Sequence, residues 1–269
     1  MAHFTPLKLY FGRDLANLLS SKLLEVYPKF DSKSFYKLID ERCDDLELKD
    51  RNILFAESLE KTLTGSFGKD LEIFIKILGD KNKEETGMFN NYYHLWPLAS
   101  YIELYGHKDY HLSMNFCEEL TMRFTSEFAV RNLILLNPEE SLVYFNKWAI
   151  SDNFHVRRLA SEGIRPKLPW AKKLSLFIDD YEKVFSILEK LKDDDIRYVQ
   201  KSVANNINDY LKLNEEAAFS LLEEWYKFKS KNTFWTIKHA LRNYKRKKDP
   251  RAMDIIDKSA KLNNIESYR

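Results

Sequence analysis

The sequence predicts an all-α fold, a solenoid of HEAT-like helical repeats. Only 7 Gly and 7 Pro interrupt the 269 residues, which leaves room for long helices and few turns. Apolar residues recur every three to four positions through most of the chain, as they do in amphipathic helices. One helix start also recurs: Val156 and Val199 are 43 positions apart, and residues 234–241 repeat the pattern about 38 positions further on. Two-helix units at intervals of about 40–47 residues are typical of HEAT-like repeats.

Start and stop signals divide the chain into successive helices. Pro28 ends the first helix, Asp31 and Ser32 can cap the second, and Gly79 ends the fourth. The polar residues 80–92 are the longest predicted loop. The predicted helices span residues 7–27, 33–43, 46–63, 71–78, 93–105, 112–123, 125–136, 139–150, 154–165, 171–177, 181–191, 195–212, 215–228, 233–245 and 250–261.

The composition indicates a folded, soluble protein with almost balanced charge. Hydrophobic residues make up 44% of the chain and charged residues 31%, and the formal net charge is +2. Attraction to nucleic acid must therefore come from local clusters of charge. Residues 238–248 hold six Lys or Arg residues and no acid, which fits either a phosphate-binding patch or an ordinary solvated face.

No metal site, cofactor site or export signal is expected. Cys43 and Cys117 are far apart and belong to no cluster with metal-ligand spacing, which predicts a reducing, cytoplasmic environment. The N-terminus lacks a signal-peptide pattern, and no window is long and apolar enough to span a membrane. A Ser/His/Asp triad and a Gly-rich phosphate loop are also missing from the sequence, which argues against acyl hydrolases and NTPases.

Residues 155–170 form the most informative stretch. At helical spacing, Arg158, Glu162 and Arg165 share one ridge with His155, so that one carboxylate lies between two guanidiniums. Pro166 ends this helix, and the next segment carries the indole of Trp170 away from it. The ridge is either a site for cationic chemistry on a phosphate backbone or a plain solvated salt-bridge ladder.

The neighbouring repeat offers a second polar face. If residues 195–212 form the equivalent helix, Lys201, Asn205 and Asn208 lie beside the ridge, with Asp209 one turn beyond Asn205. Asn and Asp are poor helix formers, so these amides either bind a ligand or tie neighbouring repeats together.

A further pair, Glu127 and Arg131, stands four residues apart, although Glu127 could simply compensate a helix dipole. Among the aromatic residues, core packing is the expected role, with a groove-lining role as the alternative for Tyr92, Tyr93 and Trp96.

These stretches resemble the AlkC branch of the AlkC/AlkD alkylpurine DNA glycosylase family. The similarity is carried by residues 120–131, 155–170, 202–209 and 239–242, and weakly by residues 6–8 and 26–31. It implies a right-handed superhelical solenoid over residues 1–269, a single domain whose concave face binds DNA. It also implies hydrolytic release of N3-alkylated bases such as 3-methyladenine and 3-methylcytosine from double-stranded DNA, by a monomer that needs no metal or cofactor. Two departures are Lys167, where Arg is expected, and the expected lack of a C-terminal immunoglobulin-like module.

The resemblance also assigns roles to individual residues. It implies that the active-site acids are Glu127, Glu162 and Asp209, that Arg158 and Arg165 bind DNA, and that Trp170 contacts the lesion. We further expect His155, Lys201, Asn205 and Asn208 to face the DNA. Two other functions stay open: a catalytically weak binder of DNA structures and a protein–protein scaffold, which is a common use of helical repeats.

Overall fold

A computed structural model describes residues 6–87 and 91–265 of the chain. Every regular element in these residues is an α-helix or a short 3-10 helix, which confirms the predicted all-α class. The chain divides into two compact units, Met1–Leu136 (unit 1) and Asn137–Arg269 (unit 2), and each is described by itself.

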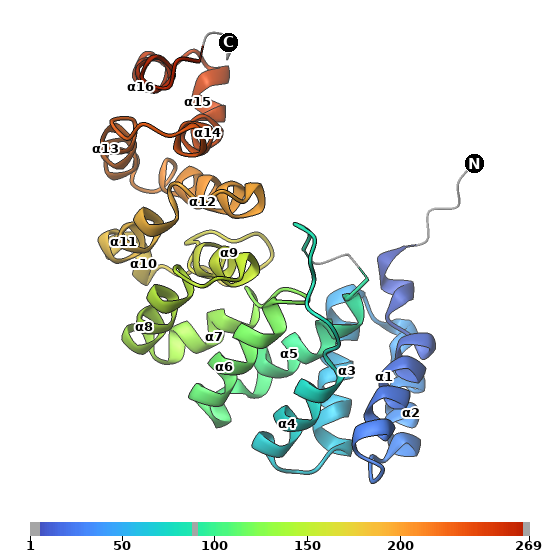
Figure 1. Ribbon diagram of the computed structural model, residues 1–269. Coiled ribbons are helices and arrows are strands. Elements are labelled where there is room, and N and C mark those ends of the chain that lie inside the picture. Colours follow the sequence, from blue (N-terminus) through green and yellow to red (C-terminus); the bar gives the residue numbers. More distant parts are fainter. Residues whose placement is uncertain (1–5, 88–90, 266–269) are drawn as a thin grey trace, which may run out of the picture. The chain divides into compact units, whose positions relative to one another are not determined.

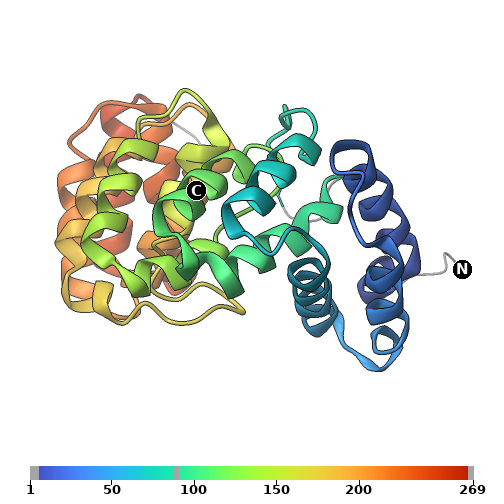
Figure 2. The same cartoon turned by 90° about the horizontal axis from the view of Figure 1, so that it is seen from below.

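Unit 1 consists of paired helices. The helices α3, α5 and α7 pack against one another in sequence, α4 packs against α6, and α1 packs against both α2 and α4. The pair α1–α2, coloured blue, lies side by side in both views (Figures 1 and 2). The elements are η1 (Leu7–Tyr10), α1 (Arg13–Val26), α2 (Ser32–Asp40), η2 (Cys43–Asp45), α3 (Leu48–Thr62), α4 (Phe67–Ile77), η3 (Tyr93–Leu95), α5 (Trp96–Tyr105), η4 (Gly106–Lys108), α6 (Tyr110–Thr121) and α7 (Ala129–Leu136).

Unit 2 stacks its helices in two layers (Figure 1). One layer contains α9, α12 and α14, and the other contains α8, α11, α13 and α16. Val156, Val199 and Ile237, which the repeat pattern aligns, are all fully buried on α9, α12 and α14. The elements are α8 (Pro138–Trp148), α9 (Phe154–Glu162), α10 (Leu176–Asp179), α11 (Tyr181–Leu191), α12 (Arg197–Tyr210), α13 (Glu215–Trp225), α14 (Lys231–Ala240), α15 (Arg242–Arg246) and α16 (Pro250–Leu262).

Several predicted helix boundaries are wrong. The predicted helix 7–27 is a 3-10 turn followed by α1, with Gly12 between them, and the predicted helix 171–177 is replaced by the single turn α10. The predicted helix 233–245 is two helices that break at Leu241. In the predicted loop 80–92, Asn82 is held by a bond from its N–H to the Met122 carbonyl (2.8 Å), while residues 88–90 lie outside the described residues.

Large apolar side chains fill both units. Trp148 and Trp225 are buried in unit 2, and the Trp225 indole N–H donates to Glu189 Oε2 at 2.6 Å. In unit 1, Trp96 is buried with its ring edge against Phe11, so that it serves the core and not a groove. Cys43 and Cys117 are buried free thiols. Within the part of the chain that the structure describes, no helix has the length and apolar character needed to cross a bilayer.

Candidate active site

The helix α9 carries the predicted charged ridge. The Asn153 side chain caps it by accepting hydrogen bonds from the backbone N–H groups of His155 (2.9 Å) and Val156 (3.4 Å). The helix ends at Glu162, three residues before the predicted end, because Gly163 is a poor helix former and Pro166 excludes helical backbone at Arg165. Glu162 is therefore the last residue of α9, and Arg165 lies in the turn that follows.

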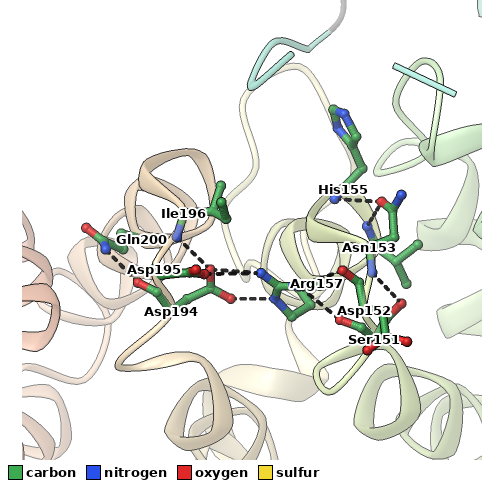
Figure 3. Close-up of polar contacts among 10 residues, drawn as sticks. Ser151, Asp152, Asn153, His155, Arg157, Asp194, Asp195, Ile196 and Gln200 are labelled. Atoms are coloured by element: carbon green, nitrogen blue, oxygen red, sulfur yellow. Dashed lines mark hydrogen bonds and ion pairs between the residues drawn. The ribbon is translucent and has the colours of Figure 1, made fainter. Parts of the chain in front are cut away.

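An arginine clamp joins the start of α9 to the segment before α12 (Figure 3). Arg157 donates from Nε and Nη2 to the carboxylate of Asp194 at 2.6 and 3.2 Å, and from Nη1 to the backbone carbonyls of Ser151 and Asp152. The hydrogen bond to Asp194 raises the pKa of Arg157 above its ordinary value. Asp194 also accepts the backbone N–H of Ile196, one residue before α12, at 2.9 Å. The clamp thus holds α9 and α12 in one register.

At the other end of α9, the Glu162 carboxylate lies among two arginines and one serine. Arg165 Nη1 is 2.7 Å from Glu162 Oε1, Arg158 Nη2 is 3.7 Å from the same oxygen, and the Ser202 hydroxyl donates to Oε2 at 2.5 Å. Both ion pairs predicted from helical spacing are present. They do not form a solvated ladder, because Glu162 is only 6% exposed.

Arg165 brings the second acid to the same place. Its Nε donates to Asp209 Oδ2 at 2.9 Å, so that one guanidinium joins Glu162 of α9 to Asp209 of α12. Asp209 is also 6% exposed. We call Glu162, Arg165, Ser202 and Asp209 the acid–arginine cluster.

The two acids of the acid–arginine cluster differ electrostatically. Burial acts to raise the pKa of Glu162, but Arg158, Arg165 and Ser202 together hold that pKa below its ordinary value. At Asp209, burial outweighs the hydrogen bond from Arg165, and the pKa is raised. Glu162 is therefore a well-compensated anion, and Asp209 is the more basic carboxylate.

Trp170 stands at the tip of an anchored loop. Leu168 and Leu174 are buried, and the backbone N–H of Leu174 donates to the Pro166 carbonyl at 3.2 Å, which closes the loop at its base. The indole is 75% exposed, and the backbone has a φ of +62°. A bulky residue in the left-handed region is strained, and such strain is concentrated at functional sites.

Three predicted DNA-binding residues take part in contacts between helices. His155 is buried, and its ring packs edge-on against Tyr198 of α12. Asn205 accepts a hydrogen bond from Arg242 Nη2 at 3.0 Å, and Asn208, also buried, donates to the Ala240 carbonyl at 2.8 Å. Lys201 of α12 is exposed. The α12 amides therefore tie repeats together, as one of the two interpretations predicts.

Glu127 belongs to unit 1, whereas Glu162 and Asp209 belong to unit 2. Glu127 lies in the turn before α7, which begins at Ala129 and not at residue 125 as predicted. Glu127 and Arg131 are both buried. The catalytic role of Glu127 stays a prediction.

The sequence analysis gave no individual role to Ser202 or Tyr198, and it counted Arg242 only as part of the basic run 238–248. Ser202 and Asp209 are seven residues apart and thus on one helical face, which is the signal that could have identified Ser202. Tyr198 lies 5.2 Å below the Arg158 guanidinium. In residues 6–87 and 91–265, no group of three His, Cys, Asp or Glu side chains is arranged to hold a metal ion.

Comparisons with known proteins place this cluster in context. The family described as DNA alkylation repair enzyme matches residues 114–244, which include Glu127, Glu162 and Asp209. The protein YhaZ of Bacillus subtilis (strain 168) is 36% identical over 251 residues, which cover 93% of this chain and 68% of YhaZ. Among solved structures, Pseudomonas fluorescens alkylpurine DNA glycosylase AlkC bound to DNA containing an abasic site analog superposes with a TM-score of 0.85. That match is 32% identical and covers 94% of this chain and 69% of AlkC.

Proposed function

The chain belongs to the DNA alkylation repair enzyme family, and from this premise we propose that it is a monofunctional DNA glycosylase acting in the cytoplasm. Its substrates are cationic N3-alkylated bases, such as 3-methyladenine and 3-methylcytosine, in duplex DNA. The similarity to AlkC, whose structure contains DNA with an abasic site analog, supports this reaction class.

The observation that carries the proposal is the junction of Glu162 and Asp209 on the guanidinium of Arg165. A buried ion cluster is a poor way to stabilise a fold, because desolvation offsets much of the attraction and packed apolar side chains serve as well. Two acids on neighbouring helices do suit glycosidic chemistry, in which negative charge stabilises a developing sugar cation. The function therefore explains a cluster that stability does not.

The chemistry needs no protonation of the leaving group. An N3-alkylated base already carries positive charge, so its departure leaves an oxocarbenium-like sugar and a neutral base. Glu162, held ionised by Arg158 and Arg165, supplies negative charge near that sugar. Asp209, the more basic acid, positions the attacking water and takes up its proton.

Arg158 and Arg165 also offset the repulsion between these acids and the phosphates of the DNA backbone. Guanidinium groups bind phosphate through bidentate hydrogen bonds. The exposed indole of Trp170 presents a face to the alkylated nucleotide, and a cationic ring favours such a face. We retain Glu127 as a third active-site acid, as the family resemblance implies.

Base release from methylated duplex DNA tests the proposal. We expect Glu162→Gln to lower the release rate ~10²- to 10³-fold, the usual effect of losing one preorganised electrostatic group, and to change DNA affinity far less. Asp209→Asn should behave alike. Glu224→Gln, an exposed acid of α13 in the same unit, is the matched control and should release bases at the wild-type rate.

Two outcomes contradict the proposal. If Glu162→Gln weakens DNA binding as much as it slows release, Glu162 is a structural residue and not a catalytic one. If the wild-type protein binds alkylated DNA and releases no base, the protein is a binder of DNA structures.

A further inference from the structure

A basic pocket lies on α14 and α15, and none of the residues that line it belongs to the acid–arginine cluster. It has a volume of about 410 Å³ and is lined by Trp235, Lys238, His239, Arg242, Lys245 and Arg246. The residues that line it include no carboxylate. Residues 238–248 thus do not form a plain solvated face, because four of their cations converge on one hollow.

The aromatic side of the pocket is already occupied. The Arg197 guanidinium covers one side of the Trp235 ring at 3.9 Å from its centroid, and the His239 ring stacks on Trp235 with centroids 4.7 Å apart and planes 10° apart. A nucleobase would therefore compete with these two groups for the Trp235 ring. The ligand of this pocket must be recognised by charge.

The positive charges in and around the pocket act on one another. Desolvation, with Arg242, Lys201 and Arg197 adding to it, lowers the pKa of His239 to about 4, and so the imidazole is neutral at physiological pH. Lys238 and Lys245 are close enough that Lys245, after desolvation, lowers the pKa of Lys238. An anion with delocalised charge would relieve this repulsion.

Arg242 links the pocket to the acid–arginine cluster. It lines the pocket, and its Nη2 donates to Asn205 of α12, one turn before Asp209 on the same helix. Burial and the nearby positive charge of Arg165 lower the pKa of Arg242, whereas the negative charge of Asp209 acts to raise it. A DNA strand bound in the pocket would therefore pass next to the acid–arginine cluster, because Asn205 and Asp209 are one helical turn apart on α12.

We propose that this pocket binds backbone phosphates of the DNA strand whose damaged nucleotide lies at the acid–arginine cluster. Lys238, Arg242, Lys245 and Arg246 contact the phosphodiester oxygens, and the Arg197–Trp235–His239 stack supports them. Because phosphates carry no sequence information, the pocket positions any duplex in the same way. The location of the strand relative to the cluster rests on the proposed function, whereas phosphate binding itself does not.

Binding to undamaged duplex DNA, measured by fluorescence anisotropy across a salt series, tests this proposal. Removing one cation that neutralises a phosphate reduces the slope of log K against log salt by about 0.9. We expect Lys238→Gln/Lys245→Gln to reduce the slope by up to about 1.8 and to weaken binding equally on unrelated sequences. The charge-conserving variant Lys238→Arg/Lys245→Arg should keep the wild-type slope.

The matched control is Lys227→Gln/Lys258→Gln, which removes two exposed lysines that pair with Glu224 and Asp254 in the other layer of unit 2. Its slope should equal that of the wild type. Should the pocket double variant fail to fold by circular dichroism, Arg246→Gln, at an exposed position, replaces it, with an expected reduction of about 0.9. A folded pocket variant with the wild-type slope overturns the proposal. Since no base is released in this assay, its failure is distinct from failure of the glycosylase activity.

Discussion

At the scale of single residues, Trp170 keeps a strained backbone conformation although its side chain is exposed. Its backbone is left-handed, where Cβ crowds the chain, and its indole is exposed and gains little from burial. Glycine would fit this φ without strain. A large aromatic residue at this position therefore indicates that the side chain serves binding.

We expect Trp170→Gly to raise the free energy of unfolding by about 1 kcal/mol or less, because relief of the left-handed strain outweighs the entropy of a glycine. Base release should fall, since the indole no longer meets the lesion. Lys248→Gly is the matched control, because Lys248 also has a positive φ, of 57°, and does not line the basic pocket. It should gain similar stability and keep its release rate. Chemical denaturation and base-release assays measure both; unchanged release by Trp170→Gly would show that the indole has no part in the reaction.

At the candidate active site, the sequence predicts contacts between residues that are close in the chain, but not contacts between different helices. The pairs Arg158–Glu162 and Glu162–Arg165 follow from helical spacing, because both partners belong to one local segment. The bond between Arg165 and Asp209 spans 44 positions and depends on how α9 and α12 stack. The role of Asn208 was ambiguous for the same reason. The sequence shows an asparagine in the middle of a helix, where this residue type is disfavoured, and only the packing of the helices shows that its side chain binds the Ala240 carbonyl.

At the scale of elements, the Arg157 clamp sets the position of α9 against α12. Asp194 has a side chain only 4% exposed, so removal of Arg157 leaves a buried carboxylate without its main counter-charge. We expect Arg157→Ala to lower the free energy of unfolding by roughly 3–5 kcal/mol. Base release should also fall, because Glu162 is carried by the same helix.

Arg251→Ala is the control for this prediction. Arg251 also binds carboxylates, those of Glu216 and Glu223, but all three side chains are at least 36% exposed. An exposed pair contributes about 1 kcal/mol or less. Denaturant unfolding of both variants checks the contrast, and equal destabilisation would mean that the clamp is no more than a surface ion pair.

Helix boundaries were predictable where a chemical signal marks them. Pro28, Asp31 and Gly79 gave ends within a few residues, and 181–191 coincides with α11. The break of the predicted helix 233–245 at Leu241 carries no strong signal, and the periodicity continues through it. There the packing of neighbouring helices decides the boundary, since helical propensity is a weak preference.

At the scale of the whole molecule, the chain behaves as two packed units that each have their own core. In unit 1, Leu59 of α3 is fully buried, and in unit 2, Leu188 of α11 is fully buried. Helical repeats contact mainly their neighbours, so stability is local and a weakened repeat need not weaken distant ones.

We therefore expect matched leucine truncations to act within one unit. Leu59→Ala and Leu188→Ala should each cost about 2–5 kcal/mol, the transfer and cavity terms of a buried leucine. Under native conditions, hydrogen exchange should rise in residues 6–87 and 91–136 for Leu59→Ala, and in residues 137–265 for Leu188→Ala, because opening a cavity frees the local helices first. Peptide-resolved mass spectrometry separates the two cases. If either variant speeds exchange equally in both units, the chain unfolds as one cooperative body, and the damage at Leu59 would reach the acid–arginine cluster as well.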